Sequence, residues 1–209
     1  MKEIFVIGVS GATASGKGTV CDNIIINLNG LNLDKSHVTI LNQDRYYIGG
    51  NEDTNYDIPQ AIDFDMFAAD LTQLKQGKSI QAPKYDFKCH CRMTTTDTIG
   101  PANIILVEGI LIFTDNRISK LCDLKVFVKA DLVRCYMRRL RRDINERGRT
   151  MDEIEARFKR DVIDSTRIHV APYEAYADIV INNDNDNGVL KGLEVLMSHI
   201  NAKINEILK

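Results

Sequence analysis

A glycine-rich stretch between a predicted strand and a predicted helix constrains the fold of this chain most strongly. The apolar run at residues 4–7 before it is typical of a buried strand, and a helical pattern starts at Val20. Between them, residues 11–17 match G-x-x-x-x-G-K, a P-loop whose backbone N–H groups, lysine and following helix bind phosphate. We therefore expect nucleotide binding at Gly11, Ala12, Thr13, Ala14, Ser15, Gly16, Lys17, Gly18 and Thr19.

The other apolar runs predict an α/β domain. Unbroken runs of this length are typical of parallel strands that are covered on both faces by helices. The predicted strands are residues 4–7, 38–41, 104–107, 124–128 and 179–181. We expect a single three-layer domain over residues 1–209, built on a five-stranded parallel sheet. Functional groups belong at the carboxyl ends of such strands, where Asp44 and Glu108 follow two of the runs.

Residues 49–100 interrupt this alternation of strands and helices. Pro59 to Gln76 has the apolar spacing of one helix, with Gly77 as its stop. Ile80 to Gly100 has the composition of a hairpin or an irregular flap. Because the insertion would lie over the strand ends, it is a natural place for substrate selection.

A strongly basic segment follows the fourth predicted strand. A helix is expected from Asp131 as its N-cap to a break at Gly148, and a capping box starting at Thr150 restarts the helix. Its arginines favour a lid over phosphates, which we place at residues 138–160. A last helix is expected from residue 189 to residue 208, packed on the sheet.

Composition excludes several classes of protein. The net charge of −2 gives no electrostatic case for binding nucleic acid or an anionic membrane. No apolar run reaches the length of about 20 residues that spans a bilayer, and the first residues lack the layout of a signal peptide. Five cysteines without the spacing of a disulfide framework favour the reducing cytoplasm. Cys89-His90-Cys91 suggests zinc, but adjacent side chains are expected to diverge and no second Cys/His pair lies nearby.

Seven motifs extend over nearly the whole chain. They are Gly8-Val9-Ser10-Gly11 with Ala14-Ser15-Gly16-Lys17, Gln43-Asp44-Arg45-Tyr46-Tyr47, Asn55-Tyr56-Asp57-Ile58-Pro59, Tyr85-Asp86-Phe87 with His90 and Arg92, Glu108-Gly109-Ile110-Leu111, Arg139 with Arg142-Asp143 and Glu146-Arg147-Gly148-Arg149, and Tyr176-Ala177-Asp178-Ile179. In this order they resemble the uridine (uridine–cytidine) kinases, a family of P-loop nucleoside kinases. The resemblance implies a P-loop kinase fold, ATP and Mg²⁺ as cofactors, and transfer of phosphate to the 5′-hydroxyl of uridine, and of cytidine, in pyrimidine salvage. It also implies a homotetramer.

The resemblance assigns roles to individual residues. Lys17, Arg142 and Arg147 would bind the ATP phosphates, and Asp44 would accept the proton of the 5′-hydroxyl and, with Glu108, bind Mg²⁺. Capping of a turn or helix is the structural alternative for both carboxylates. The nucleoside would contact Tyr47, Tyr56, Asp57, Tyr85, Phe87, His90, Arg139, Arg149 and Arg157, with Asp57 and Arg139 on the ribose. The aromatic residues could instead form the core of the flap.

Three positions depart from the family pattern. Gly18 replaces a metal-binding hydroxyl, Arg157 replaces glutamine and Asp164 replaces proline, the last two near the expected nucleoside site. Arg157 would either point into the site or pair outward with Asp161 one helical turn later.

The sequence also leaves competing functions open. A related kinase could act on a sugar phosphate or pantothenate, although the aromatic residues favour a flat base. A GTPase-type switch would need an Asn-Lys-x-Asp guanine reader, which the sequence lacks. The arginine cluster could bind nucleic acid, but in a neutral protein with a P-loop it more simply serves ATP.

Overall fold

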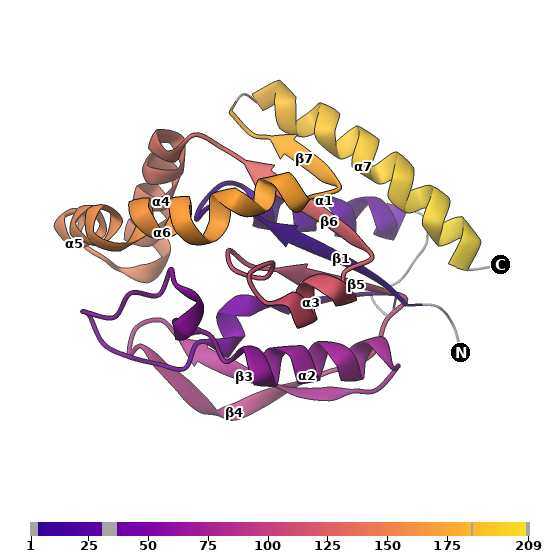
Figure 1. Cartoon of the computed structure of the whole chain (residues 1–209), viewed down its shortest axis with the longest axis horizontal. Coiled ribbons are helices and arrows are strands. Elements are labelled where there is room, and N and C mark those ends of the chain that lie inside the picture. Colours follow the sequence, from indigo (N-terminus) through magenta and orange to yellow (C-terminus); the bar gives the residue numbers. More distant parts are fainter. Residues whose placement is uncertain (1–3, 31–36, 185, 208–209) are drawn as a thin grey trace.

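The central sheet is parallel and five-stranded, as predicted (Figure 1). The computed structural model describes residues 4–30, 37–184 and 186–207. The strand order is β2-β5-β1-β6-β7, and every neighbouring pair is parallel. The five strands are β1 (Phe5–Ser10), β2 (Val38–Asn42), β5 (Ile104–Glu108), β6 (Leu124–Lys129) and β7 (Ile179–Asn182). All five lie on the predicted apolar runs, each extended by a residue or more.

The unbroken apolar runs follow from burial on both faces of the sheet. In β1, Val6 packs into one core cluster, whereas Ile7 and Val9 pack into the other. In β5, Ile105 and Leu106 divide between the clusters in the same way. Successive side chains of a strand point to opposite faces of the sheet. When helices cover both faces, both sets of side chains are buried, so apolar residues do not alternate with polar ones.

Helices cover both faces (Figure 1). The side chains of α1 (Lys17–Gly30) and α7 (Asp186–Ile207) pack into the cluster that contains Ile7. Those of α2 (Phe64–Lys75) and α3 (Asn116–Leu121) pack into the cluster that contains Val6. The expected three layers are therefore present. The predicted C-terminal helix is confirmed with an earlier start, while the predicted end at Leu208 lies outside the described residues.

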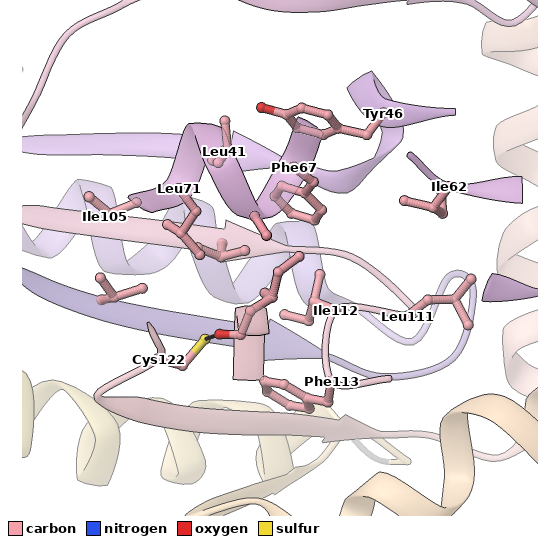
Figure 2. Packing of buried hydrophobic residues seen from close by; sticks show 14 of the residues in the cluster. Leu41, Tyr46, Ile62, Phe67, Leu71, Ile105, Leu111, Ile112, Phe113 and Cys122 are labelled. Carbon is pink, nitrogen blue, oxygen red and sulfur yellow. Dashed lines mark hydrogen bonds between the residues drawn. The ribbon is translucent and has the colours of Figure 1, made fainter. Parts of the chain in front are cut away.

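The core on the α2 face extends from the sheet to Tyr46, which lies after β2 (Figure 2). Tyr46 is fully buried and stacks on Phe67 with the ring centroids 4.4 Å apart. Its hydroxyl donates a hydrogen bond of 2.8 Å to Asp70, which satisfies a buried polar atom. This packing anchors the 3-10 helix Gln43–Tyr46, which carries Asp44.

The insertion contains the predicted hairpin, but the helix predicted before it is wrong at its start. Pro59–Ala61 forms a separate 3-10 helix, and α2 begins only after Asp63, whose side chain accepts from the backbone N–H of Met66. Between the two helices, Ile62 forms an antiparallel bridge with Tyr47 and adopts extended backbone. The hairpin consists of β3 (Ile80–Asp86) and β4 (Cys91–Ile99).

The basic segment folds as a chain of helices. α4 (Leu132–Arg147) is capped by Asp131 and ends at Gly148, whose φ of 66° is left-handed. Thr150 starts α5 (Met151–Arg157) with a capping box, so the predicted break at Gly148 and the predicted restart are both confirmed. The path continues through the π-helix Phe158–Val162, α6 (Ile163–Ser165), the π-helix Thr166–Val170 and the 3-10 helix Ala171–Tyr176. No helix in the described part of the chain has the length and apolar character that crossing a membrane requires.

Candidate active site

The P-loop follows β1 and wraps tightly enough to require glycine at two positions. Gly11 has a φ of +146°, and a Cβ there would lie 2.3 Å from the carbonyl oxygen of Val128. Gly16 has a φ of +106°, and a Cβ there would lie 2.2 Å from Nδ2 of Asn183. Asn183 Nδ2 also donates to the carbonyl oxygen of Ser15 at 2.6 Å, so the end of β7 supports the loop. Both positions thus require glycine, because neighbouring atoms leave no room for a Cβ and because the backbone angle is positive.

Lys17 lies in the middle of the site. Its side chain is buried, and its ammonium donates to the carbonyl oxygen of Ala12 at 2.9 Å. Burial lowers the pKa of Lys17, while the carboxylates of Glu108 and Asp44 act in the opposite direction. The carboxylates thus favour the charged ammonium of Lys17, the form that binds phosphate oxygens.

Asp44 and Glu108 come together at the carboxyl ends of neighbouring strands, as predicted. Asn42 lies between them: its Oδ1 accepts from the N–H of Asp44 at 2.7 Å and its Nδ2 donates to Glu108 Oε2 at 2.6 Å. Asn42 is therefore the cap of the 3-10 helix, which removes capping as the role of Asp44. Burial raises the pKa of Glu108, and Lys17 opposes this increase.

These two carboxylates fit a magnesium ion that is bound partly by substrate. The described residues contain no cluster of three or more His, Cys, Asp and Glu that could enclose a metal. Mg²⁺ commonly needs only one or two carboxylates together with phosphate oxygens and water. Gly18 offers no hydroxyl, and the space where a Cβ would point from it is empty to 4 Å.

Asp143 organises the arginines of α4 and the turn after it. Its side chain is fully buried among four guanidinium groups. The distances to its carboxylate oxygens are 2.8 Å from Arg142, 3.4 Å from Arg139, 3.6 Å from Arg147 and 3.8 Å from Arg149. Burial acts to raise the pKa of Asp143, but the arginines, Arg142 first, leave it below its usual value. The motif Arg142-Asp143 in the sequence does not by itself predict this role of Asp143.

An aromatic group forms the far end of the site. The Tyr47 ring packs against Tyr56 at 5.5 Å and Tyr85 at 5.2 Å between centroids. Phe87 contacts Tyr85 at 5.3 Å, and the Arg147 guanidinium lies 4.3 Å above the Phe87 ring. These side chains line a pocket as well as packing on the core, so the two interpretations of the aromatic residues are compatible.

Polar groups lie beside this aromatic wall. Asp57 and Arg139 approach to 3.9 Å, and Arg139 donates to Thr13 Oγ1 at 3.3 Å. Burial raises the pKa of Asp57, and Arg139 opposes the shift. His90 stacks on Tyr56 with an interplanar angle of 13°.

Arg157 points into the pocket. Its Nη2 lies 3.5 Å from Nε2 of His90, while Asp161 pairs with Arg160 at 2.8 Å. The outward pair with Asp161 is therefore wrong. Asp164 is exposed, pairs with Arg167 at 3.6 Å, and lies outside the residues that line the pocket.

The cysteines beside His90 also differ from expectation. Cys89 and Cys91 are joined by a disulfide with their Cα atoms 5.4 Å apart. The prediction that their side chains diverge is wrong, because His90 between them has a left-handed φ of 53°. No separate signal in the sequence marked His90 for this backbone conformation.

Most of the predicted site residues line two adjoining pockets. One contains Thr13, Ala14, Lys17, Asp44, Tyr47, Tyr56, Asp57, Tyr85, Phe87, His90, Glu108, Arg139, Arg142, Arg147, Arg149 and Arg157. The other contains Ala14, Gly16, Lys17, Gly18, Thr19, Asp44, Glu108 and Arg142. Gly11, Ala12 and Ser15 shape the loop without lining either pocket. Residues that sequence analysis missed in the linings include Asn42, Arg138, Asn183 and Asp161.

Comparison with known proteins shows the family of the chain. A model of the Phosphoribulokinase / Uridine kinase family matches residues 6–189. The chain belongs to this family. It is 36% identical to the uridine kinase of Shewanella frigidimarina over 97% of this chain and 99% of that one. It is 37% identical to uridine-cytidine kinase A of Dictyostelium discoideum over 99% of this chain, which spans 41% of that longer protein.

Solved structures support the fold of this kinase family. A kinase attributed to the fructose transport system of Silicibacter sp. TM1040 matches with a TM-score of 0.70 at 17% identity, over 86% of this chain and 90% of that one. A protein described as a possible uridine kinase of Bacillus stearothermophilus matches with a TM-score of 0.60 at 16% identity, over 86% and 89%. At such identities the likeness concerns the fold alone.

Proposed function

We propose that this kinase transfers the γ-phosphate of ATP to the 5′-hydroxyl of uridine, and of cytidine, as a step of pyrimidine salvage. The observation that carries the proposal is the overlap of the two pockets. Ala14, Lys17, Asp44, Glu108 and Arg142 line both, so they occupy the junction between a donor site on the P-loop and an acceptor site among the aromatic residues. Phosphoryl transfer needs such a junction, because the attacking and leaving oxygens lie in line.

At this junction the chain supplies charge and a base. Lys17 and Arg142 neutralise negative charge on the transferred phosphoryl group, and the planar Arg142 guanidinium can contact two of its oxygens. Asp44 accepts the proton of the 5′-hydroxyl as the hydroxyl attacks. The hydrogen bond from the Asp44 backbone to Asn42 orients the residue toward the junction.

Asp44 and Glu108 would bind Mg²⁺ together with the ATP phosphates. Bound there, the ion would neutralise charge that develops on the phosphates during transfer. Asn42 donates to only one oxygen of Glu108, so the other remains open to the metal or a water molecule.

The aromatic pocket selects the acceptor. Asp57 and Arg139 suit the vicinal hydroxyls of a ribose, because a carboxylate accepts from both and a guanidinium donates. Tyr56, Tyr85 and Phe87 enclose a flat base, with Tyr47 beneath them. His90, Arg149 and Arg157 face the polar edge of the base.

The lid connects the two ends of the site. Arg147 belongs to the arginine cluster around Asp143 and also stacks on Phe87 of the hairpin. We infer that residues 138–160 act as the lid over the phosphates and residues 49–100 as the nucleoside-binding insertion of a single domain. We further propose that the enzyme works in the cytoplasm as a homo-oligomer, a tetramer by family resemblance, without nucleic acid or membrane as a partner.

A panel of acceptors tests the function. Purified protein with ATP and Mg²⁺ should release ADP when uridine or cytidine is added, and the product should be the 5′-monophosphate. The panel includes pantothenate and a pentose phosphate, since a related kinase acting on either is the competing function. Turnover with those acceptors and none with pyrimidine nucleosides would overturn the proposal, as would nucleotide hydrolysis that needs no acceptor.

A further inference from the structure

The turn of the β3–β4 hairpin combines two pocket residues with the only disulfide among the described residues. Phe87 and His90, at either end of this turn, both line the nucleoside pocket. Cys89 and Cys91 flank His90, are joined to each other, and are exposed to solvent. The free cysteines Cys21, Cys122 and Cys135 are all buried. Among the described residues, Cys89 and Cys91 are therefore the cysteines that reagents in solution can reach.

The disulfide closes a small ring around His90. With φ at 53°, His90 adopts left-handed backbone, which costs most L-residues free energy relative to ordinary conformations. The covalent link between the residues on either side restricts the alternatives that the turn could adopt. The carbonyl of His90 also accepts from the N–H of Gly50 at 3.0 Å, which is a weaker restraint on the same residue.

This backbone conformation determines where the imidazole lies. The His90 ring stacks on Tyr56 at 5.3 Å between centroids and its Nε2 lies 3.5 Å from Nη2 of Arg157. Burial and the nearby Arg157 and Arg149 lower the pKa of His90, so the ring is neutral at neutral pH and Nε2 can accept from Arg157. A relaxed turn would move the ring away from both partners and open the base end of the pocket.

We propose that Cys89 and Cys91 form a reversible thiol–disulfide site that couples the affinity for nucleoside to the supply of small-molecule disulfides. The oxidised pair fixes His90 in the pocket, and the reduced pair releases it. The inference rests on the function proposed above, because the affected pocket is the one assigned to the nucleoside. In a reducing compartment a disulfide on an exposed turn is expected to be transient and regulatory.

The chemistry is thiol–disulfide exchange with a disulfide R–S–S–R as oxidant. One cysteine thiolate attacks a sulfur of R–S–S–R, forming a mixed disulfide and releasing one thiolate, which takes up a proton to become R–SH. The second cysteine then attacks the protein sulfur of the mixed disulfide, forming the Cys89–Cys91 bond and releasing a second R–SH. The two protein thiols lose two electrons and two protons, and the oxidant gains them.

The first measurement concerns the site itself. Protein reduced with a phosphine and then exposed to oxidised glutathione should lose about 2 Da in intact mass, with no lasting glutathione adduct. Peptide mapping should assign the link to Cys89 and Cys91. A stable glutathione adduct, or no change in mass, would overturn the proposal without reference to any enzymatic activity.

The second measurement concerns the pocket. Reduction should raise KM for uridine about tenfold, since binding must then restore the left-handed backbone of His90, while KM for ATP and kcat stay close to their oxidised values. The double variant Cys89→Ser/Cys91→Ser should match the reduced protein and ignore oxidised glutathione. Lys88→Ser, an exposed change in the same turn, should keep the full response.

The outcomes separate this inference from the proposed function. Equal KM values for uridine in both redox states, with normal turnover, would overturn the thiol–disulfide coupling and leave the kinase activity intact. An absence of nucleoside phosphorylation in either state would overturn the proposed function. Uridine binding measured by calorimetry in both states gives the same comparison without catalysis.

Discussion

At the scale of single residues, the neighbouring carboxylates of Asp44 and Glu108 have different surroundings. Both side chains are half-buried, and burial raises the pKa of Glu108 against the opposing charge of Lys17. Asp44 lies on a 3-10 helix at the pocket junction and accepts no hydrogen bond from Asn42, which contacts it only through the backbone. The Asp44 carboxylate is thus free of the Asn42 contact that orients Glu108, which suits the proposed roles of Asp44 as base and of Glu108 as metal ligand.

Replacing Asp44 tests its role as base. Asp44→Asn keeps the size of the side chain and removes its ability to accept a proton, so kcat should fall by a factor on the order of 10²–10⁴. ATP binding, measured by calorimetry, should persist. Asp65→Asn, a change at an aspartate that is 89% exposed on α2, is the matched control and should keep normal turnover. Near-normal kcat in Asp44→Asn would exclude Asp44 as the base.

Glu108 and Gly18 test the metal site. Glu108→Gln removes a charged ligand, so the Mg²⁺ concentration needed for half-maximal activity should rise by about tenfold or more. Gly18→Thr restores the hydroxyl of the common P-loop pattern into open space and should be tolerated. Titration of activity with MgCl₂ compares both variants with the native protein. A Glu108→Gln curve that overlays the native one would remove Glu108 from the metal site.

Replacing Arg157 tests the preference for one nucleobase, uracil or cytosine. Arginine only donates hydrogen bonds, so it suits the carbonyl oxygens of uridine better than the 4-amino group of cytidine. The native enzyme should favour uridine, and Arg157→Gln should reduce the ratio of kcat/KM for uridine to that for cytidine by about tenfold. Arg167→Gln, at an arginine that is 70% exposed, is the control. An unchanged ratio in Arg157→Gln would show that Arg157 does not set base preference.

At the scale of elements, α4 and the turn after it group arginines around one buried carboxylate. One buried carboxylate, that of Asp143, faces four guanidinium groups from α4 and the turn after it. Without Asp143 these cations would repel one another across the site where phosphate is expected to bind. Asp143 therefore holds together the positive charges that are proposed to bind phosphate, which would orient them before a ligand binds.

Neutralising Asp143 should weaken the protein and this arrangement together. Asp143→Asn leaves the buried Arg139 and three partly buried guanidinium groups without their counter-ion, and the free energy of unfolding should fall by about 3 kcal/mol. Glu146→Gln removes the same charge from an exposed position of the same helix and should change stability by less than about 0.5 kcal/mol. Urea unfolding at neutral pH measures both. Equal stability of the two variants would contradict the role given to Asp143.

The same carboxylate predicts a dependence on acid. The folded protein lowers the pKa of Asp143, so its contribution to stability is complete above the unfolded value of about 3.9 and is lost as pH falls through the folded value. The stability difference between the native protein and Asp143→Asn should therefore be constant near neutral pH and shrink below about pH 4. A difference that stays constant down to pH 2.5 would contradict it.

At the scale of the whole molecule, sequence patterns predicted the sheet well and the tertiary details poorly. Buried strands such as β1 are apolar on both faces, so the runs alone identify them. Ile62, in contrast, leaves the predicted helix because it pairs with Tyr47, a contact that local spacing does not encode. The ring around His90 and the cluster around Asp143 likewise depend on backbone angle and on partners brought together by folding. Motif resemblance named residues most of which line the two pockets, but it could not supply the interactions that orient them.

Residues of the sheet edge, the hairpin and the basic helices line the pockets together, so ligands should stabilise the molecule as a unit. A nucleoside at about 100 times its Kd adds about 2.7 kcal/mol, which corresponds to an increase in Tm of about 5–10 °C for a chain of this size. Uridine and a non-hydrolysable ATP analogue should each raise Tm, and together by more than either alone, because Arg147 contacts both Asp143 and Phe87. Pantothenate at the same concentration should leave Tm unchanged. Thermal unfolding without any response to millimolar uridine would contradict the assignment of the aromatic pocket to a nucleoside.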